Sequence, residues 1–301
     1  ARGDIEAMYI MGENPAMYDP DQNHTRRALA GLSHLVVQDL FLTETARHAD
    51  VILPASALAE KWGTFTNTNR QVQLARPALD PPGEARQDLW IIQEIARRLG
   101  LDWNYAHPRD VFDEMHTVMS SLNHIGWERL ECEGAVTYPC DSDDSPGNEI
   151  VFTQRFPTES GRARIVPADL LPPAEQPDAD FPFILTTGRI LEHWHTGAMT
   201  RRTQVLDEIE PEAVVAMNQA DLSRLGLAAG ERVEVRTRRG LIALTARDDA
   251  NVPPGVIFIP FCFAEAAANF LTNPQLDPYG KIPEFKFCAA AVTPARQPQP
   301  A

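Results

Sequence analysis

One stretch of this 301-residue chain combines side chains that a hydrophobic core does not need. Residues 186–202 read TTGRILEHWHTGAMTRR, and they follow a short apolar run, 181–185, that predicts a strand. Arginine supplies forked donors for phosphate or for the edge of a heteroaromatic ring, and histidine and tryptophan supply flat faces and N–H donors. Gly188 and Gly197 let the backbone come close to a ligand. The stretch therefore indicates a ligand-binding loop, and a solvated polar loop is the alternative.

Composition limits the classes of function. The hydrophobic content of 44% is ordinary for a globular protein, the length favours two domains, and the net charge of −15 speaks against non-specific nucleic-acid binding. No apolar run approaches the ~18 residues of a membrane span. Residues 1–4 contain neither an initiator methionine nor a signal-peptide profile, so we expect the chain to be a piece of a longer protein.

The cysteines show no metal-binding pattern. Cys132, Cys140, Cys262 and Cys288 form no C-x-x-C pair, which argues against a zinc knuckle or an iron–sulfur cluster within this chain. A disulfide between Cys132 and Cys140 stays open. Cys262 lies between two phenylalanines, which indicates a buried thiol with a raised pKa and little nucleophilicity.

The first part of the chain predicts an α/β domain. Apolar runs at 7–11, 35–37 and 51–54 read as strands, and helix-like segments at 23–32 and 43–48 alternate with them. Such alternation implies a parallel sheet, where ligands bind beyond the carboxyl ends of the strands. No G-x-G-x-x-G is present, so the usual NAD fingerprint is missing. Polar residues do follow each strand, at 12–15, 38–39 and 54–55.

The last part predicts a compact β-barrel. Strands are expected at 213–217, 232–237, 241–246 and 256–260, with one helix at 219–225. An amphipathic helix at 87–99, another at 110–122 and a proline-rich linker at 167–182 precede them. We therefore predict a Rossmann-like domain over 1–175 and a β-barrel domain over 176–301.

Several side chains at the predicted strand and helix ends could hydrogen-bond a guanine or a pterin. Carboxylates pair well with the N–H edge of such rings, and amides present both a donor and an acceptor. For each residue the alternative is a helix cap or a turn. The candidates are Asn14, Gln38, Asp39, Asp50 and Asp88.

A family resemblance extends over essentially the whole chain. The stretch G-R-x-L-E-H-W-H-T-G-x-M-T-R-R resembles the loop that opens the last domain of molybdopterin oxidoreductases, which include formate dehydrogenase large subunits and periplasmic-type nitrate reductases. The motif V-x-Q-D-x-F-x-T-E-T-A-x-x-A-D-V-x-L-P at 36–54 is also similar to that family. Further motifs stand in the expected order at 12–15, 63–67, 88–90 and 283–289.

The resemblance implies a bis-molybdopterin guanine dinucleotide cofactor with molybdenum or tungsten, bound by a Rossmann-like domain and a barrel of the double-psi type. The chain also departs from the family, which often has Asp at position 14 and in some members has Ser at 55 and Tyr at 285. By the resemblance, one dinucleotide would contact Asn14, Gln38, Ala55 and Asp88, and the pterins would be approached by Arg189, Glu192, His193, His195 and Thr196. The other dinucleotide would lie under Asn269, Phe285 and Lys286, and the further cofactor-binding candidates are Gly12, Glu13, Asp39 and Gly188.

The same loop contains the candidate residues for binding diphosphate and for a rival metal site. Each dinucleotide carries a diphosphate, so the acidic chain needs a local basic cleft, and Arg189, Arg201 and Arg202 are its candidates. A zinc pair at His193 and His195 is a rival interpretation. No third ligand stands nearby at a suitable spacing, and the neighbouring residues fit pterin contact better.

The resemblance also implies that the function depends on segments of the protein that are not in this sequence. The family's N-terminal Cys-rich iron–sulfur motif and its Cys or selenocysteine metal ligand are not in this sequence, so we expect no catalytic or metal-ligating residue here and no activity from the fragment alone. The tail resembles NAD-linked cytoplasmic formate dehydrogenases most. Formate would be oxidised, and electrons would leave through iron–sulfur clusters to flavin-bearing, NAD-reducing subunits. Nitrate reduction, a non-catalytic scaffold and a guanine-nucleotide-binding protein are the alternatives.

Overall fold

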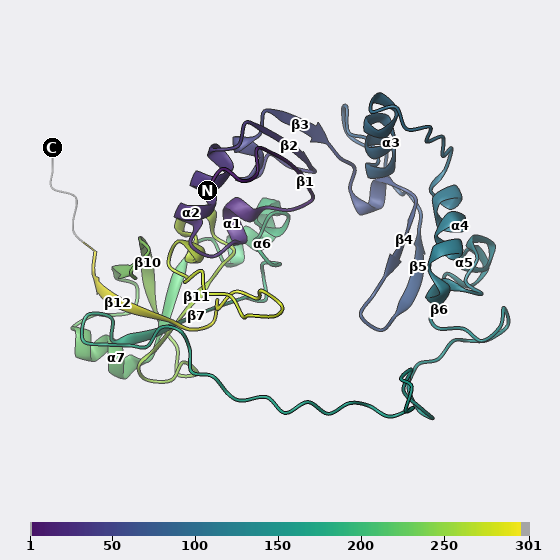
Figure 1. The fold of residues 1–301 in the computed structure, drawn as a ribbon. Coiled ribbons are helices and arrows are strands. Elements are labelled where there is room, and N and C mark those ends of the chain that lie inside the picture. Colours follow the sequence, from purple (N-terminus) through teal and green to yellow (C-terminus); the bar gives the residue numbers. More distant parts are fainter. Residues whose placement is uncertain (1, 296–301) are drawn as a thin grey trace. The chain divides into compact units, whose positions relative to one another are not determined.

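The computed structural model describes residues 2–295 and shows two compact units. The first unit combines the start of the chain with its end, Ala1–Ile52 with Leu170–Ala301, and the second is Leu53–Asp169. Figure 1 shows the elements of each unit along the chain. This grouping does not test the predicted domains, 1–175 and 176–301, which stay a prediction.

A small sheet opens the first unit. Its strands are β1 (Ala7–Met11), β2 (His34–Asp39) and β3 (Val51–Pro54), in that order. β1 and β2 run parallel with Met11 opposite Gln38, as the alternation of strands and helices predicted. Helices α1 (Pro15–Tyr18) and α2 (Gln22–Ala30) lie between them in sequence. The carboxyl ends of β1 and β2 therefore meet at one edge of the sheet.

A closed six-stranded barrel makes up the rest of the first unit, in the order β10-β8-β11-β7-β12-β9. The pairs β7–β11 and β8–β10 are parallel, while β9–β10, β7–β12, β9–β12 and β8–β11 are antiparallel. Helices α6 (Gln204–Ile209) and α7 (Gln219–Leu225) belong to the same part of the chain. The strands are β7 (Phe183–Gly188), β8 (Val214–Met217), β9 (Arg232–Arg236), β10 (Leu241–Asp248), β11 (Val256–Pro260) and β12 (Cys288–Pro294).

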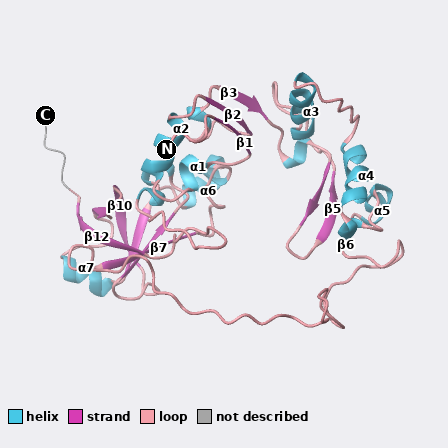
Figure 2. Ribbon diagram, in the orientation of Figure 1, coloured by secondary structure: helices cyan, strands magenta, loops and turns pink. Residues whose placement is uncertain are grey.

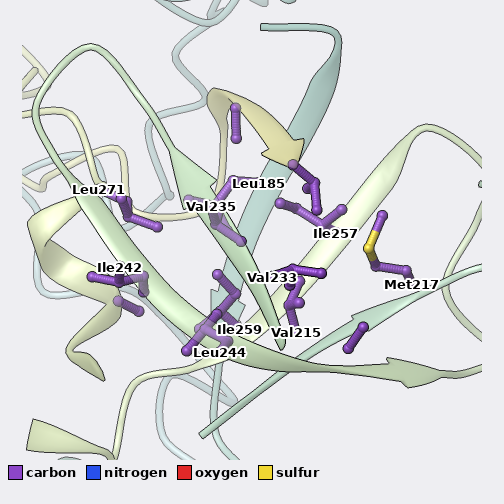
Figure 3. Packing of buried hydrophobic residues seen from close by; sticks show 14 of the residues in the cluster. Leu185, Val215, Met217, Val233, Val235, Ile242, Leu244, Ile257, Ile259 and Leu271 are labelled. Atoms are coloured by element: carbon purple, nitrogen blue, oxygen red, sulfur yellow. The ribbon is translucent and has the colours of Figure 1, made fainter. Parts of the chain in front are cut away.

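Alternation along the strands builds the barrel core. Every second residue of β9 and β10 points inward, because successive side chains of a strand face opposite sides. Val233, Val235 and Leu244 are fully buried in consequence. Figure 3 shows these side chains converging with Leu185, Ile257 and others from the neighbouring strands. The interior is thus packed with apolar side chains.

The second unit has its own sheet and core. Its antiparallel strands are β4 (Gly63–Thr66), β5 (Gln71–Ala75) and β6 (Ala135–Thr137). Figure 2 shows its three helices, α3 (Asp88–Arg98), α4 (Pro108–Val118) and α5 (Trp127–Glu133). The buried Trp127 is at the centre of a cluster with Phe112, Ile125 and Val136.

Some element predictions were wrong in extent. The helix expected at 110–122 begins at Pro108, ends at Val118, and is followed by a separate 3₁₀ turn, Ser120–Leu122. The helix expected at 43–48 is only a 3₁₀ turn, Ala46–His48. Helices α5 and α6 and strands β6 and β12 were not predicted as elements.

No candidate membrane-spanning helix is found in residues 2–295. None of the helices described there is both long enough and apolar enough to span a bilayer.

The barrel core predicts a contrast between two leucines. Leu185→Ala should lower the free energy of unfolding by about 3 kcal/mol, since Leu185 is fully buried and its truncation leaves a cavity. Leu241→Ala, at a residue 49% exposed, should change it by about 0.5 kcal/mol or less. Urea denaturation measures both. Equal losses would contradict the packing described for β7.

Candidate functional site

A cavity of about 510 Å³ opens at the end of β7 in the first unit, and a larger one of about 630 Å³ lies beside α2. The cavity at β7, called the main cavity below, draws on five of the residues that the sequence singled out, from segments far apart in the chain. Within residues 2–295, no carboxylate lines it. The lining residues are Tyr18, Thr187, Arg189, His195, Phe261, Asn269, Phe285 and Lys286.

Two cations face this cavity without a carboxylate partner. Within residues 2–295, neither Arg189 nor Lys286 forms an ion pair. The Arg189 guanidinium lies 5.0 Å from the centre of the Trp194 ring, and the Lys286 ammonium donates to the carbonyl of Thr187. Burial, and then the nearby Arg189, lower the pKa of Lys286. Such a pair of uncompensated cations suits an anionic ligand.

His195 lies between the two cations and an aromatic cluster. Its backbone has φ +51°, a left-handed conformation rare for a residue with a side chain. Its ring meets Phe261 edge-on at 5.4 Å and Tyr18 at 6.3 Å between ring centres. Burial first, and then Arg189, lower the pKa of His195, while Glu13 raises it. The imidazole is therefore neutral at pH 7 and can both donate and accept a hydrogen bond.

A second cavity, of about 210 Å³, lies beside the carboxyl ends of β1 and β2. Tyr18 and His195 line both cavities. Burial, and then a hydrogen bond to Glu13, raise the pKa of Tyr18, so its hydroxyl stays protonated. The other lining residues are Gly12, Glu13, Asn14, Asp39, Leu40, Phe41, Thr43, Thr196, Ala198 and Met199.

The polar ends of Asn14 and Asn269 are already used within the chain. Asn14 Oδ1 accepts from Thr45 N at 3.0 Å and from Thr45 Oγ1 at 2.8 Å, and its Nδ2 donates to Glu44 at 2.8 Å. Asn269 Nδ2 donates to the carbonyl of Tyr18 at 2.7 Å. These amides shape the cavity walls, and direct hydrogen bonds from them to a ring stay a prediction.

Other predicted residues of the first unit lie outside both cavities. Gln38 is fully buried on β2 and accepts from the hydroxyl of Tyr9. His193 is fully buried, and its Nε2 lies 2.9 Å from the carbonyl oxygen of Glu210. Gly188 ends β7, where an added Cβ would come within 2.5 Å of the Phe258 ring. Glu192, in the loop after β7, lines neither cavity.

Two further candidates belong to the second unit. Asp88 is the first residue of α3 and accepts from the ammonium of Lys61. Ala55 is buried and forms a bridge with Arg86. Asp50 of the first unit accepts from Leu35 N at 2.7 Å, so it fastens the neighbouring strand, as the alternative interpretation expected.

The two arginines that end the loop differ from Arg189. Arg201 bonds Asp207 at 2.5 Å and Glu265 at 3.0 Å, so its charge is compensated and the prediction that it binds diphosphate is not supported. Arg202 donates to the carbonyl of Ala198, and its guanidinium lies 4.5 Å from the centre of the Phe41 ring.

The metal and cysteine alternatives find no support. Residues 2–295 contain no group of three His, Cys, Asp or Glu side chains that could hold a metal ion. The four cysteines are unpaired, which excludes the Cys132–Cys140 disulfide. Burial raises the pKa of Cys262 to about 12, consistent with an inert thiol.

Sequence reasoning missed Tyr18, Thr187 and Phe261 as lining residues. Thr187 lies within the stretch 186–202 and Phe261 lies next to Cys262, so position in the sequence was an available signal. Tyr18 follows the 12–15 motif by one helical turn, which is a weaker signal.

Comparisons with known proteins identify the family models and the fold that this chain matches. Residues 1–98 match the family model described as molybdopterin oxidoreductase, and residues 183–289 match the molydopterin dinucleotide binding domain. The fold is similar to that of the acetylene hydratase from Pelobacter acetylenicus, with a TM-score of 0.79 and 20% identity over 96% of this chain and 44% of that one. At that identity the likeness concerns the fold alone.

Two curated relatives are similar in sequence. The F420-dependent formate dehydrogenase subunit alpha of Methanocaldococcus jannaschii is 47% identical over 96% of this chain and 43% of its own length. The assimilatory nitrate reductase catalytic subunit of Bacillus subtilis is 34% identical over 97% of this chain and 42% of its own length. The chain thus spans less than half the length of these relatives.

The electrostatics of His195 can be tested by titration. Arg189→Ala should raise the pKa of His195, because it removes a cation that disfavours protonation, and Glu13→Gln should lower it, because it removes a favourable carboxylate. Histidine NMR signals followed against pH measure both shifts. Arg202→Ala is the control and should leave the pKa unchanged. An unmoved pKa in Arg189→Ala would contradict the arrangement described.

Proposed function

The chain belongs to the molybdopterin oxidoreductase family, and we propose that its residues bind the dinucleotide arms of a molybdenum or tungsten bis-pterin guanine dinucleotide. The observation that carries this proposal is the charge of the main cavity. Arg189 and Lys286 line it and no carboxylate does, although the whole chain has a net charge of −15. A diphosphate is the part of the cofactor that such a cavity fits.

Each wall of the two cavities has a role in this proposal. Arg189 and Lys286 bind diphosphate oxygens, and the neutral His195 offers a flat face and one donor to a ring. In the second cavity, the carboxylates of Glu13 and Asp39 can accept from the N–H edge of a guanine or a pterin. When bound, the cofactor supplies the redox chemistry, while this chain holds and orients it.

The remaining sequence-based assignments are proposals of the same kind. Asp88, Gln38, Glu192, His193 and Ala55 stay predicted cofactor contacts, made through side chains or backbone. The parallel sheet supports a Rossmann-like domain. The closed barrel with mixed strand directions supports the double-psi type.

For the reaction, we propose formate oxidation by the complete protein. Formate dehydrogenase alpha subunits are similar to this chain at 47% and 43% identity. Electrons would leave through iron–sulfur clusters outside these residues to partner subunits in the cytoplasm. The sequence suggested NAD as the final acceptor, whereas the names of these two relatives favour F420.

One alternative has specific support, and a second is disfavoured by the cavity. Nitrate reduction is favoured by the nitrate reductase relative at 34% identity. A non-catalytic scaffold would not need to keep Arg189, His195 and Lys286 together in one cavity, so the retained basic lining argues against it.

Cofactor retention tests the cation assignment. Arg189→Ala in the complete protein should lower bound molybdenum or tungsten and pterin about tenfold after dialysis, because a charge-assisted contact contributes about 1.5–3 kcal/mol. Arg224→Ala is the matched control, since that arginine pairs with Asp221 on α7 away from both cavities. Metal analysis and fluorescence of the released, oxidised pterin measure occupancy. Unchanged occupancy in Arg189→Ala would refute the assignment.

Substrate and acceptor are tested together with the purified complete enzyme. We expect formate-dependent reduction of F420 or of NAD, and no nitrate-dependent oxidation of a reduced dye. Absorbance assays with each pair measure the rates. Nitrate reduction without formate oxidation would favour the nitrate reductase alternative. A folded protein without pterin would favour the non-catalytic scaffold.

A further inference from the structure

Strand β7 carries a polar residue where its pattern calls for an apolar one. Phe183 and Leu185 point into the barrel and are fully buried. Thr187 occupies the next inward position and is 3% exposed. A hydroxyl there needs a hydrogen-bond partner, because burying an unpaired one costs free energy. The partner therefore explains why a threonine is accommodated.

That partner lies in the segment that precedes β12. Thr187 Oγ1 donates to the carbonyl of Phe285 at 3.1 Å, and the ammonium of Lys286 donates to the carbonyl of Thr187. One residue of β7 thus holds two consecutive residues of the cavity wall. Both held residues, and Thr187 itself, line the main cavity.

Strand pairing shows why these hydrogen bonds of Thr187 are needed. β12 pairs with β7 only as far as Cys288 opposite Leu185, whereas β11 continues along β7 to Gly188. Beyond Leu185 the edge of β7 that faced β12 has no strand beside it among residues 2–295. The hydroxyl and carbonyl of Thr187 take the place of ladder hydrogen bonds there, at the point where the two chains separate.

We propose that Thr187 is a positioning residue that fixes Phe285 and Lys286 against the cavity, so that the ammonium faces the ligand's phosphate. This inference rests on the proposed cofactor function. The contact acts through Lys286, whose position depends on the Thr187 carbonyl and on the Phe285 carbonyl next to it. Thr187 would therefore act on the ligand through Phe285 and Lys286.

The residues on either side of Phe285 and Lys286 are held independently. Asn273 Nδ2 donates to Glu284 at 3.0 Å and to the carbonyl of Phe287 at 3.2 Å. Loss of the Thr187 hydroxyl removes the bond to Phe285 and leaves the bond from Lys286 to the Thr187 carbonyl. Lys286 should then loosen through its neighbour Phe285 while the barrel stays folded.

Three variants of the complete enzyme test the proposal. Thr187→Val removes the donor at nearly constant volume, Thr187→Ser restores it, and Thr186→Val makes the same exchange at the neighbouring, outward-facing position. Cofactor loss during dialysis at increasing salt should be about tenfold faster in Thr187→Val, with a weaker dependence on salt because Lys286 is displaced. Thr187→Ser and Thr186→Val should behave as the wild type, and all melting temperatures should agree within a few degrees.

A second readout does not need the cofactor. Reductive methylation of Lys286, followed by mass spectrometry in protein stripped of pterin, should be several-fold faster in Thr187→Val. Wild-type rates of methylation and of cofactor loss in that variant would overturn the positioning role and leave the proposed function standing. Absence of pterin from the wild-type protein, together with faster Lys286 methylation in Thr187→Val, would contradict the proposed cofactor function and support the positioning role of Thr187.

Discussion

The separation of two strands determines the main cavity. β7 is paired on both sides over its first residues and on one side only beyond Leu185, where β12 ends its pairing and β11 continues. The released edge faces the segment before β12, where Thr187 bonds Phe285 and Lys286. These three residues line the cavity at the point where β7 changes from two neighbouring strands to one.

Charge gives the cavity its selectivity. The chain carries 42 acidic against 27 basic residues, and the charge of Arg201 beside the site is compensated by two carboxylates. Arg189 and Lys286 are kept apart from carboxylates and lie close enough for Arg189 to lower the pKa of Lys286. The two positive charges repel each other, and an anion that binds between them removes this repulsion. A phosphate group is such an anion.

The cavity walls also depend on contacts between the start and the end of the chain. Asn269 fixes the carbonyl of Tyr18, and the backbone N–H of Asp21 donates to the carbonyl of Thr272 at 3.2 Å. These bonds hold α1 against the barrel, so Tyr18 and His195 together line both cavities. A ligand that occupied both cavities would pass these two side chains.

The sequence by itself determined the parallel strands, the barrel hairpin and the loop with Arg189 and His195, because periodicity and turn residues are local signals. It also indicated Lys286 and Phe285 through a motif. It did not determine that Asn14 and Asn269 would be used inside the chain, that His193 would be buried, or that Arg201 would be neutralised. Only the tertiary structure decided these outcomes, because the partners of a polar side chain are residues distant in sequence. The same reason hid Tyr18 and Thr187: each acts through a contact more than 90 residues away along the chain.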